Sequence, residues 1–535
     1  MGVGRESFRA RAARIPVLRA AVELADGPWL ALGVGAMLAA VSAMAAYVDG
    51  AYSTDGWFIL AAGREVAESG IPRENPWADV EGMGVVVQQW LHDLWAWTWY
   101  EAAGFGGLDA MAAVEAIAFV LAAWAFLPAM RSSGRPGAGA VAIGCGAAVL
   151  AMAPYINVRP TLWTACAMLC ACGICSAARR NPRLYALLPI LTALHVNLHA
   201  AMWPLPVFAA ACFLLPEAWA RPCRAARRGL YRSVAGLARS RIPLVLALLG
   251  MAAASFANPY GIEGSLYGLA GAGEAAYGGY IKEMRPLLSL VALDPVFALY
   301  PAAFLAAVAA ACAKARRLPP PTAAAFLAVS LVAGLLSARN IWIFQVACTM
   351  AALSVAGEPQ RRIRWVEAAC LLLVAASVVC GMSGGLAMDS CPDPAEADGP
   401  RNDGINAGGI PSWESGEALA LLASVISAEG GGRVFCSTDV GMAVLEFYGC
   451  KVPFDLRPEV WAPGITGVAG YYPWRDYADA CAGAADTARY LAEYGFRWAV
   501  VPDADAARWK EEFGMVETAS SDGWSLLEIA GRTPL

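Results

Sequence analysis

The chain has 535 residues, of which 59% are hydrophobic and 16% are charged, and its mean hydropathy is +0.50. Apolar runs of about 20 residues, the length that spans a bilayer as a helix, recur along it. The composition therefore excludes an ordinary soluble globular protein. The formal net charge of −5 excludes little, because charges in a membrane protein are segregated by topology.

In chain order, the apolar runs predict eleven membrane helices, so the expected fold class is an all-α polytopic membrane protein with a small C-terminal α/β domain. The predicted spans are 29–48, 108–130, 137–153, 160–178, 184–199, 201–216, 242–257, 287–312, 320–336, 341–356 and 365–382. Ala43-Met44-Ala45 is typical of a signal-peptidase site. The first run is long enough to span, however, so we interpret it as an uncleaved anchor.

The distribution of Lys and Arg indicates the orientation of these helices. If residues 1–28 are inside, the loops between successive helices alternate between the two sides of the membrane. The inner segments then contain 23 of the 39 basic residues. Positive residues stay on the cytoplasmic side of a membrane. We therefore expect a bacterial plasma-membrane protein with a cytosolic basic N-terminus, 1–28, and with the chain after residue 383 outside.

A long outer loop, 49–107, follows the first span and contains two amphipathic segments. From Asp55 to Glu68, apolar residues recur on one helical face. A second helix is predicted from about Gln88 to Ala103, rich in Trp and Tyr, whose rings favour the headgroup level of a bilayer. Both helices are expected to lie flat at the outer surface.

The order of motifs in this loop resembles a known family. Asp55 is followed by a G-R-x-x-x-E-x-G-I-P run at 63–72 and by a helix that opens Trp90-Leu91. This arrangement is similar to the first outer loop of GT-C superfamily glycosyltransferases, in particular the bacterial multi-pass proteins related to lipid A aminoarabinose transferases and protein O-mannosyltransferases. Weaker matches continue the resemblance along nearly the whole chain: Asn157-Val158-Arg159-Pro160, Asn197-Leu198-His199, Asn258-Pro259-Tyr260-Gly261 and Arg339-Asn340.

The resemblance implies a GT-C-like transmembrane domain, 29–382, that moves a hexosyl or pentosyl group with inversion. The donor would be a polyprenyl-phosphate sugar, and the acceptor an envelope glycan, lipid or protein on the outer face. Asp55 stands where the family places its catalytic acid. The alternative is that Asp55 only caps the helix that follows it.

Two features of the family pattern are missing. Relatives carry a second acid after the I-P turn and a His-Glu pair before the W-L, where this chain has Asn75 and Gln88-Gln89. Amides cannot act as bases, so either a nearby acid assists Asp55 or the chemistry has changed or been lost. The candidate supporting acids are Asp79, Glu81 and Asp93.

Other polar residues on the outer side could complete a site. Few cations are expected on the outer side, and four of them are candidates for binding the donor phosphate: Arg159, Lys282, Arg285 and Arg339. The alternative is that each anchors the chain at the membrane surface. Polar residues at membrane depth mark a cavity, and those expected to line one are Asn157, His195, Asn197, His199, Asn258 and Tyr260. His195 and His199 share a helix face and could bind a metal, but hydrogen bonds to neighbouring helices are the preferred interpretation. No metal is assigned, and the sequence leaves a divalent cofactor open.

A linker rich in Gly, Pro, Asp and Asn, 383–411, precedes a predicted extracytoplasmic α/β domain, 412–535. Its predicted elements are helices at 414–428, 440–448 and 486–494, strands at 433–436, 451–454 and 497–501, and a hairpin-like stretch to 529. No nucleotide-binding motif is present in it. Among Cys391, Cys436, Cys450 and Cys481, a Cys436–Cys450 disulfide is one candidate pairing. The cysteines at 166–175 are interpreted as packing residues.

Three classes of protein are compatible with these sequence patterns. The first is the lipid-dependent glycosyltransferase, with membrane lipid and no nucleic acid among its partners. The second is a non-catalytic descendant of the same fold that binds a lipid-linked saccharide or scaffolds envelope assembly. A transporter is disfavoured, because the charged residues gather at one face whereas transporters place their site near the midplane.

Overall fold

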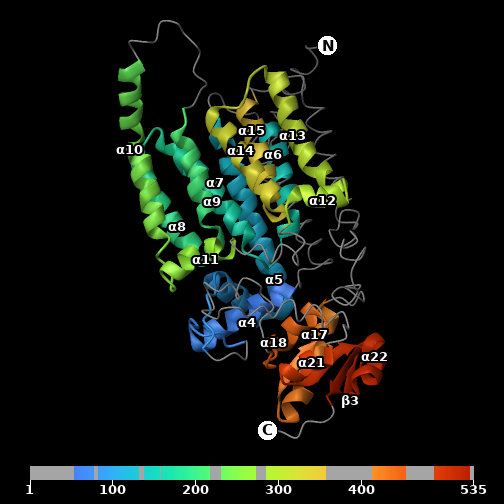
Figure 1. The fold of residues 1–535 in the computed structure, drawn as a ribbon. Helices are drawn as coiled ribbons and strands as arrows, with labels where there is room; N and C mark the ends of the chain where they lie inside the picture. The colour runs from blue at the N-terminus through green and yellow to red at the C-terminus, as the bar shows by residue number, and fades with distance from the viewer. Residues whose placement is uncertain are drawn as a thin grey trace, which may run out of the picture.

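The computed structural model describes residues 54–77, 82–131, 138–156, 158–216, 230–272, 285–356, 412–452 and 487–529 (Figure 1). The predicted cytosolic segment 1–28, the spans 29–48 and 365–382, and the linker 383–411 lie outside these residues.

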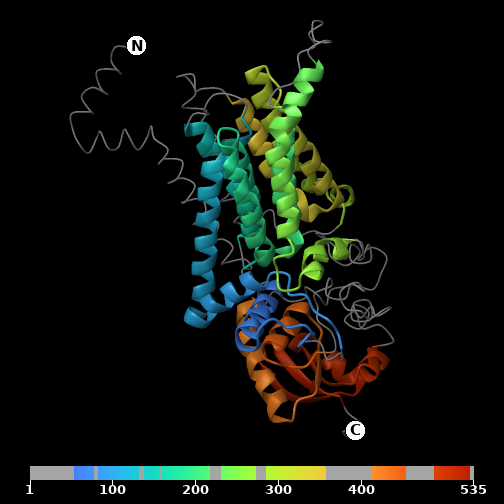
Figure 2. The ribbon, with the colours of Figure 1, turned by 90° about the vertical axis from the view of Figure 1, so that its left-hand side faces the viewer.

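A bundle of apolar helices forms one end of the molecule (Figures 1 and 2). Its helices are α5 (Trp90–Phe126), α6 (Ala138–Met152), α7 (Thr161–Ala178), α8 (Leu187–Leu198), α9 (Pro204–Ala211), α10 (Leu230–Ala254), α11 (Ile262–Ala272), α12 (Leu287–Leu293), α13 (Val296–Ala315), α14 (Pro321–Leu336) and α15 (Ile341–Val355). Short 3-10 turns extend several of them: η1 (Leu127–Met130), η2 (Ala153–Tyr155), η3 (Pro182–Ala186), η4 (Ala200–Met202), η5 (Cys212–Leu214) and η8 (Ala338–Asn340).

Within the described ranges, four helical stretches are long and apolar enough to cross a membrane by length and composition. They are Trp90–Met130, Thr161–Ala178, Phe297–Ala315 and Ala338–Val355. The chain is therefore a mostly helical, multi-pass membrane protein with a small sheet. The expected single span 287–312 is wrong: α12 and α13 are separate helices, because Asp294 is extended before Pro295.

Helix α5 folds back on itself. Its backbone is non-helical at Ala103 and Gly104, and Gly104 has a φ of +59°, which only glycine adopts readily. His92 and Glu115 are 23 residues apart, which a straight helix would separate by about 35 Å. His92 Nε2 nevertheless lies 3.3 Å from Glu115 Oε1. The two arms of α5, before and after this break, therefore lie side by side.

Helix α4 (Thr54–Ser69) packs between α5 and the C-terminal part of the chain (Figures 1 and 2). A Cβ at Gly63 would lie 2.1 Å from the backbone oxygen of Asp93, so α4 and α5 are in direct backbone contact there. Every side chain from Trp57 to Ala62 is buried. The expectation that the apolar face of α4 lies in the bilayer is therefore wrong, since protein covers the helix on all sides in this stretch.

The C-terminal part contains a four-stranded sheet in the order β1-β2-β4-β3. β1 pairs with β2 in parallel, whereas β2–β4 and β3–β4 are antiparallel. The elements in chain order are α17 (Ser412–Ala428), β1 (Arg433–Cys436), α18 (Asp439–Phe447), α21 (Thr487–Glu493), β2 (Phe496–Pro502), α22 (Asp503–Phe513), β3 (Val516–Ser521) and β4 (Trp524–Glu528). Helix α22 was not predicted from the sequence, and the predicted strand 451–454 is reduced to a bridge between Arg433 and Lys451 in its described residues.

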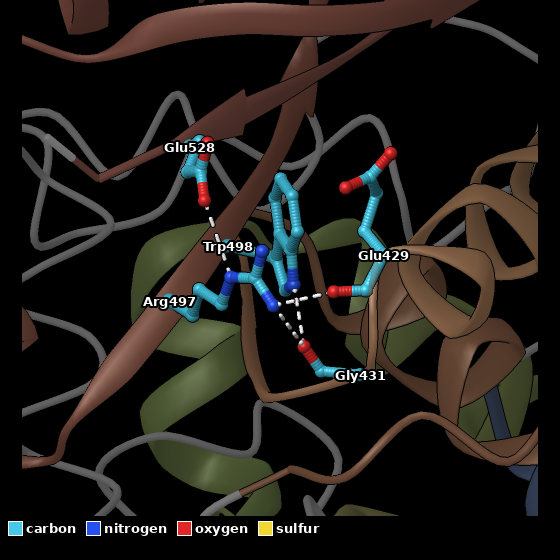
Figure 3. Close-up of polar contacts among 5 residues, drawn as sticks. All are labelled: Glu429, Gly431, Arg497, Trp498 and Glu528. Carbon is cyan, nitrogen blue, oxygen red and sulfur yellow. Dashed lines mark hydrogen bonds and ion pairs between the residues drawn. The ribbon is translucent and has the colours of Figure 1, made fainter. Parts of the chain in front are cut away.

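Arg497 joins the glycine-rich turn before β1 to the sheet (Figure 3). Its Nη1 donates to the carbonyl oxygens of Glu429 at 2.7 Å and Gly431 at 3.2 Å, and its Nε donates to Glu528 Oε1 at 3.2 Å. The guanidinium also lies 4.5 Å from the ring centroid of Trp498, whose Nε1 donates to Gly431 O. This cluster fixes a turn, because Arg497 Nε and Nη1 and Trp498 Nε1 all donate to oxygens of the chain itself.

Cys436 and Cys450 are free thiols, so the candidate disulfide between them is not formed in this structure. Burial raises the pKa of the Cys450 thiol to about 12, which keeps it protonated and unreactive at neutral pH. The cysteines of α7 are also free, as packing residues would be.

Candidate functional site

Asp55 lies in the first turn of α4 and forms an ion pair with Arg159. Arg159 Nη2 is 2.7 Å from Asp55 Oδ2, and the two side chains are 22% and 41% exposed, respectively. Arg159 directly precedes α7, whose helix begins after Pro160. Since α4 begins at Thr54, Asp55 is already inside the helix, where an acid also interacts favourably with the helix dipole. The carboxylate thus remains accessible while a cation from the bundle fixes its orientation.

The segments that carry two further predicted phosphate-binding cations adjoin the segment of Arg159. Tyr155, four residues before Arg159, donates its hydroxyl to the carbonyl oxygen of Arg339 at 3.1 Å. The N–H of Ala338 donates to the carbonyl oxygen of Arg285 at 3.0 Å. The segments that carry Arg159, Arg285 and Arg339 therefore adjoin, whereas Lys282 lies outside the described residues.

A buried polar group lies deeper, between α7 and α8. The hydroxyl of Thr164 is 2.7 Å from His199 Nδ1 and 3.1 Å from His195 Nε2, so it joins the two rings. Both histidines are buried. Arg339 and His92 are close enough to His199 to interact with it electrostatically. All three histidines of the chain are thus brought together, beside one of the candidate phosphate-binding cations.

Asn197 connects α8 to the outer loop. Its Oδ1 accepts from Trp90 Nε1 at 2.8 Å, and its Nδ2 donates to the carbonyl oxygens of Ala193 and Ala257. The N–H of Ala200 donates to the carbonyl oxygen of Gln88 at 2.8 Å. These bonds fasten the start of α5 to the bundle, so Asn197 holds the loop in place.

His92 and Glu115 form a buried pair that was not predicted from the sequence. Both side chains are fully buried, and Trp163 Nε1 donates to Glu115 Oε1 at 2.9 Å. Asp93, a predicted supporting acid, is 2% exposed and accepts from Gln89 Nε2 at 2.9 Å. A lone Glu inside an apolar span was the signal available, because such residues face a bundle interior or a cavity.

Two further predicted polar residues stabilise a turn. Asn258 Oδ1 accepts from the N–H of Tyr260, and the Tyr260 hydroxyl donates to the carbonyl oxygen of Pro72 at 3.0 Å. Arg73 Nη2 donates to the carbonyl oxygen of Pro259 at 2.6 Å, and its guanidinium lies 5.0 Å from the centre of the Tyr260 ring. These contacts dock the 258–261 turn onto the outer loop. Asn157, Asp79 and Glu81 lie outside the described residues.

Two of the three residues that stand where the motif lacks its acid and its His-Glu pair, Asn75 and Gln89, have structural partners. Asn75 is 6% exposed, and its Oδ1 accepts from the N–H of Trp77 at 2.9 Å, a local turn bond typical of Asn. Gln89 Nε2 is bonded to Asp93. In the part of the chain that the structure covers, no group of three or more His, Cys, Asp or Glu is placed to hold a metal ion.

Comparison with known proteins gives structural likeness alone. No family model matches the chain, and no curated protein matches it. The structure is similar to the archaeal oligosaccharyltransferase AglB from Archaeoglobus fulgidus in complex with an inhibitory peptide and a dolichol-phosphate: 13% identity, 89% of this chain, 69% of that chain and a TM-score of 0.49. It is also similar to the Archaeoglobus fulgidus oligosaccharyltransferase tethered to an acceptor peptide containing the NVT sequon, with 12% identity, the same coverage of both chains and a TM-score of 0.48.

A similar architecture does not by itself assign an activity, which depends on the residues of the site.

Proposed function

We propose that this chain is a membrane glycosyltransferase that moves a sugar from a polyprenyl-phosphate donor to an acceptor on the outer face of a bacterial plasma membrane. The observation that carries the proposal is the accessible Asp55 carboxylate, held by Arg159 at the junction where the segments of Arg285 and Arg339 also meet. One base is thus paired with one cation, and the segments of two further arginines adjoin at the same end of the helix bundle.

The chemistry follows from that arrangement. Asp55 takes the proton of the acceptor's attacking group, which then bonds to the anomeric carbon of the sugar as the carbon–oxygen bond to phosphate breaks. Arginines stabilise the negative charge that develops on the departing polyprenyl phosphate. The resemblance to inverting GT-C enzymes agrees with such a single displacement.

The experiment has two arms. The first compares the glycosylated envelope components of a deletion strain with those of its parent. The second gives purified protein in lipid nanodiscs a panel of radiolabelled polyprenyl-phosphate sugars together with the deletion-strain extract. We expect a glycosylated product to be absent from the deletion strain, and the purified protein to transfer the matching sugar onto the deletion-strain extract. If the deletion strain keeps every glycosylated envelope component and no donor in the panel is consumed, the enzyme proposal fails.

A second candidate is a non-catalytic protein that binds a lipid-linked saccharide. It is favoured by Asn75 and Gln89, whose side chains are committed to structural hydrogen bonds where relatives carry acid–base residues. Saturable binding of a polyprenyl-phosphate sugar without its consumption would favour this candidate over the enzyme.

The proposed orientation has its own test. Because 23 of the 39 basic residues lie in the segments assigned to the inside, we expect a reporter fused after residue 383 to be active only outside the cytoplasm. Alkaline phosphatase and green fluorescent protein fusions at this position form a matched pair, since the first is active outside and the second inside. Cytoplasmic fluorescence there would contradict the eleven-span arrangement.

A further inference from the structure

The helix that carries Asp55 contacts the C-terminal part of the chain within two residues of the acid. Trp57 is 1% exposed, and the centre of its ring lies 5.2 Å from that of Phe447 and 6.3 Å from that of Tyr448. On its other side, a Cβ at Gly416 of α17 would lie 3.2 Å from Trp57 Cζ2. The C-terminal end of α18 and the start of α17 therefore enclose the indole of Trp57.

A second contact lies two helical turns further along the same face of α4. Arg64 Nη2 donates to the carbonyl oxygen of Phe447, the last residue of α18. The Arg64 guanidinium also lies 4.6 Å from the centre of the Phe447 ring. A cation at a helix C-terminus satisfies an otherwise unpaired carbonyl and interacts favourably with the helix dipole. Phe447 therefore binds α4 through both its ring and its backbone.

The other faces of α4 are held by the membrane bundle. Gly63 is packed on the backbone of Asp93 in α5, and Asp55 reaches Arg159 before α7. The position of the Asp55 carboxylate thus depends on α5, on Arg159 and on the end of α18. Of these three, only α18 belongs to the C-terminal part of the chain.

We propose that Phe447 and Arg64 are positioning residues, through which the C-terminal part holds α4 and sets the orientation of the Asp55 carboxylate. The catalytic consequence rests on the proposed function, whereas the mechanical coupling does not. The C-terminal part then acts as a clamp on the helix that carries the base, and it does not supply a reacting group itself.

The test measures hydrogen exchange of α4 backbone amides in the full chain in nanodiscs. We expect Phe447→Ala and Arg64→Ala each to speed exchange across 56–62 by about tenfold or more, because local opening of α4 then costs less. Exchange in α15 should not change. The matched controls are Glu68→Ala, exposed on α4, and Leu421→Ala, which is 60% exposed on α17, and neither should alter α4. Arg64→Lys, which keeps a cationic donor, should restore part of the protection.

Two outcomes overturn the clamp. Exchange of 56–62 that matches the unmodified chain in both Phe447→Ala and Arg64→Ala would show that α18 does not hold α4. If Phe447→Ala also speeds exchange in β2, that substitution has loosened the C-terminal part itself. The test then depends on Arg64→Ala alone, because Arg64 lies on α4 and not in the C-terminal part. An Arg64→Ala variant with unchanged α4 exchange then refutes the proposal.

Activity gives a readout that is separable from the proposed function. In a transferring protein, the clamp predicts that Arg64→Ala lowers kcat with little change in KM, because the base is misplaced while substrate contacts remain. A chain with no transfer at all would refute the enzyme while the exchange experiment still tests the clamp. A variant with fast α4 exchange and unchanged kcat would contradict the role assigned to Phe447 and Arg64 in orienting Asp55.

Discussion

Replacing Asp55 by Asn is expected to lower sugar transfer by about 100-fold or more, because the amide cannot accept the acceptor's proton. The substitution keeps the size of the side chain and a donor–acceptor group in the first turn of α4, but it exchanges the ion pair with Arg159 for a neutral contact. The loss should therefore appear mainly in kcat. The measurement is turnover of the radiolabelled donor by purified variants, together with thermal unfolding of each.

The controls separate a base from a structural acid. Glu68→Gln makes the same acid-to-amide change at an exposed position of α4 and should leave turnover unchanged. Asp55→Ala removes the base and all of its polar contacts, so it should be as inactive as Asp55→Asn but less stable. Near-normal transfer by Asp55→Asn would end the case for Asp55 as the base, and would direct attention to Asp79 and Glu81.

Much of the local structure was predictable from the sequence, because it depends on periodicity and turn chemistry. The 3.6-residue pattern of 55–68 and the glycine and proline signals that follow it place α4 close to its observed bounds, Thr54–Ser69. The strand at 433–436 coincides with β1, where a short apolar run is bounded by glycines and polar residues. Such signals lie within one segment and need no knowledge of its neighbours.

What covers each apolar surface was not predictable in the same way. Trp97 and Tyr100 were expected to meet lipid headgroups, yet their ring centres lie 6.3 and 5.9 Å from that of Phe447. An amphipathic pattern says that a face must be buried, but a bilayer and a protein partner bury it equally well. The contact between the outer loop and α18 joins residues more than 300 positions apart, so only the tertiary structure reveals it.

The ion pairs show the same limit. Asp55 and Arg159 were assigned to separate roles, as base and as phosphate-binding cation, and the structure joins them directly at 2.7 Å. His92 stood beside the Trp90-Leu91 motif and Glu115 inside an apolar span, without any spacing that linked them. They meet only because α5 reverses at Gly104, and the glycines at 104, 106 and 107 do not by themselves predict a reversal of that size.

Glu115→Ala is expected to destabilise the protein by about 3 to 5 kcal/mol, because it removes the nearer carboxylate of a fully buried pair and leaves His92 only Asp93, whose Oδ1 lies 4.0 Å from His92 Nδ1. Trp163 Nε1 loses its acceptor as well, which adds an unsatisfied buried donor. Since the pair joins the two arms of α5, the loss should loosen the outer loop relative to the bundle. The measurement is the unfolding transition in detergent, followed by size-exclusion chromatography of heated samples.

Two comparisons make this prediction specific to the pair. Glu101→Ala removes an exposed acid from the same helix and should change stability by no more than about 0.5 kcal/mol. Glu115→Gln keeps an oxygen acceptor for Trp163 but removes the negative charge beside His92. Its loss of stability should therefore lie between those of Glu115→Ala and Glu101→Ala. An equal transition temperature for Glu115→Ala and Glu101→Ala would mean that the buried pair does not hold the α5 reversal closed. The packing of Gly107, whose Cβ would lie 1.9 Å from the backbone oxygen of Trp99, would then be the feature that does.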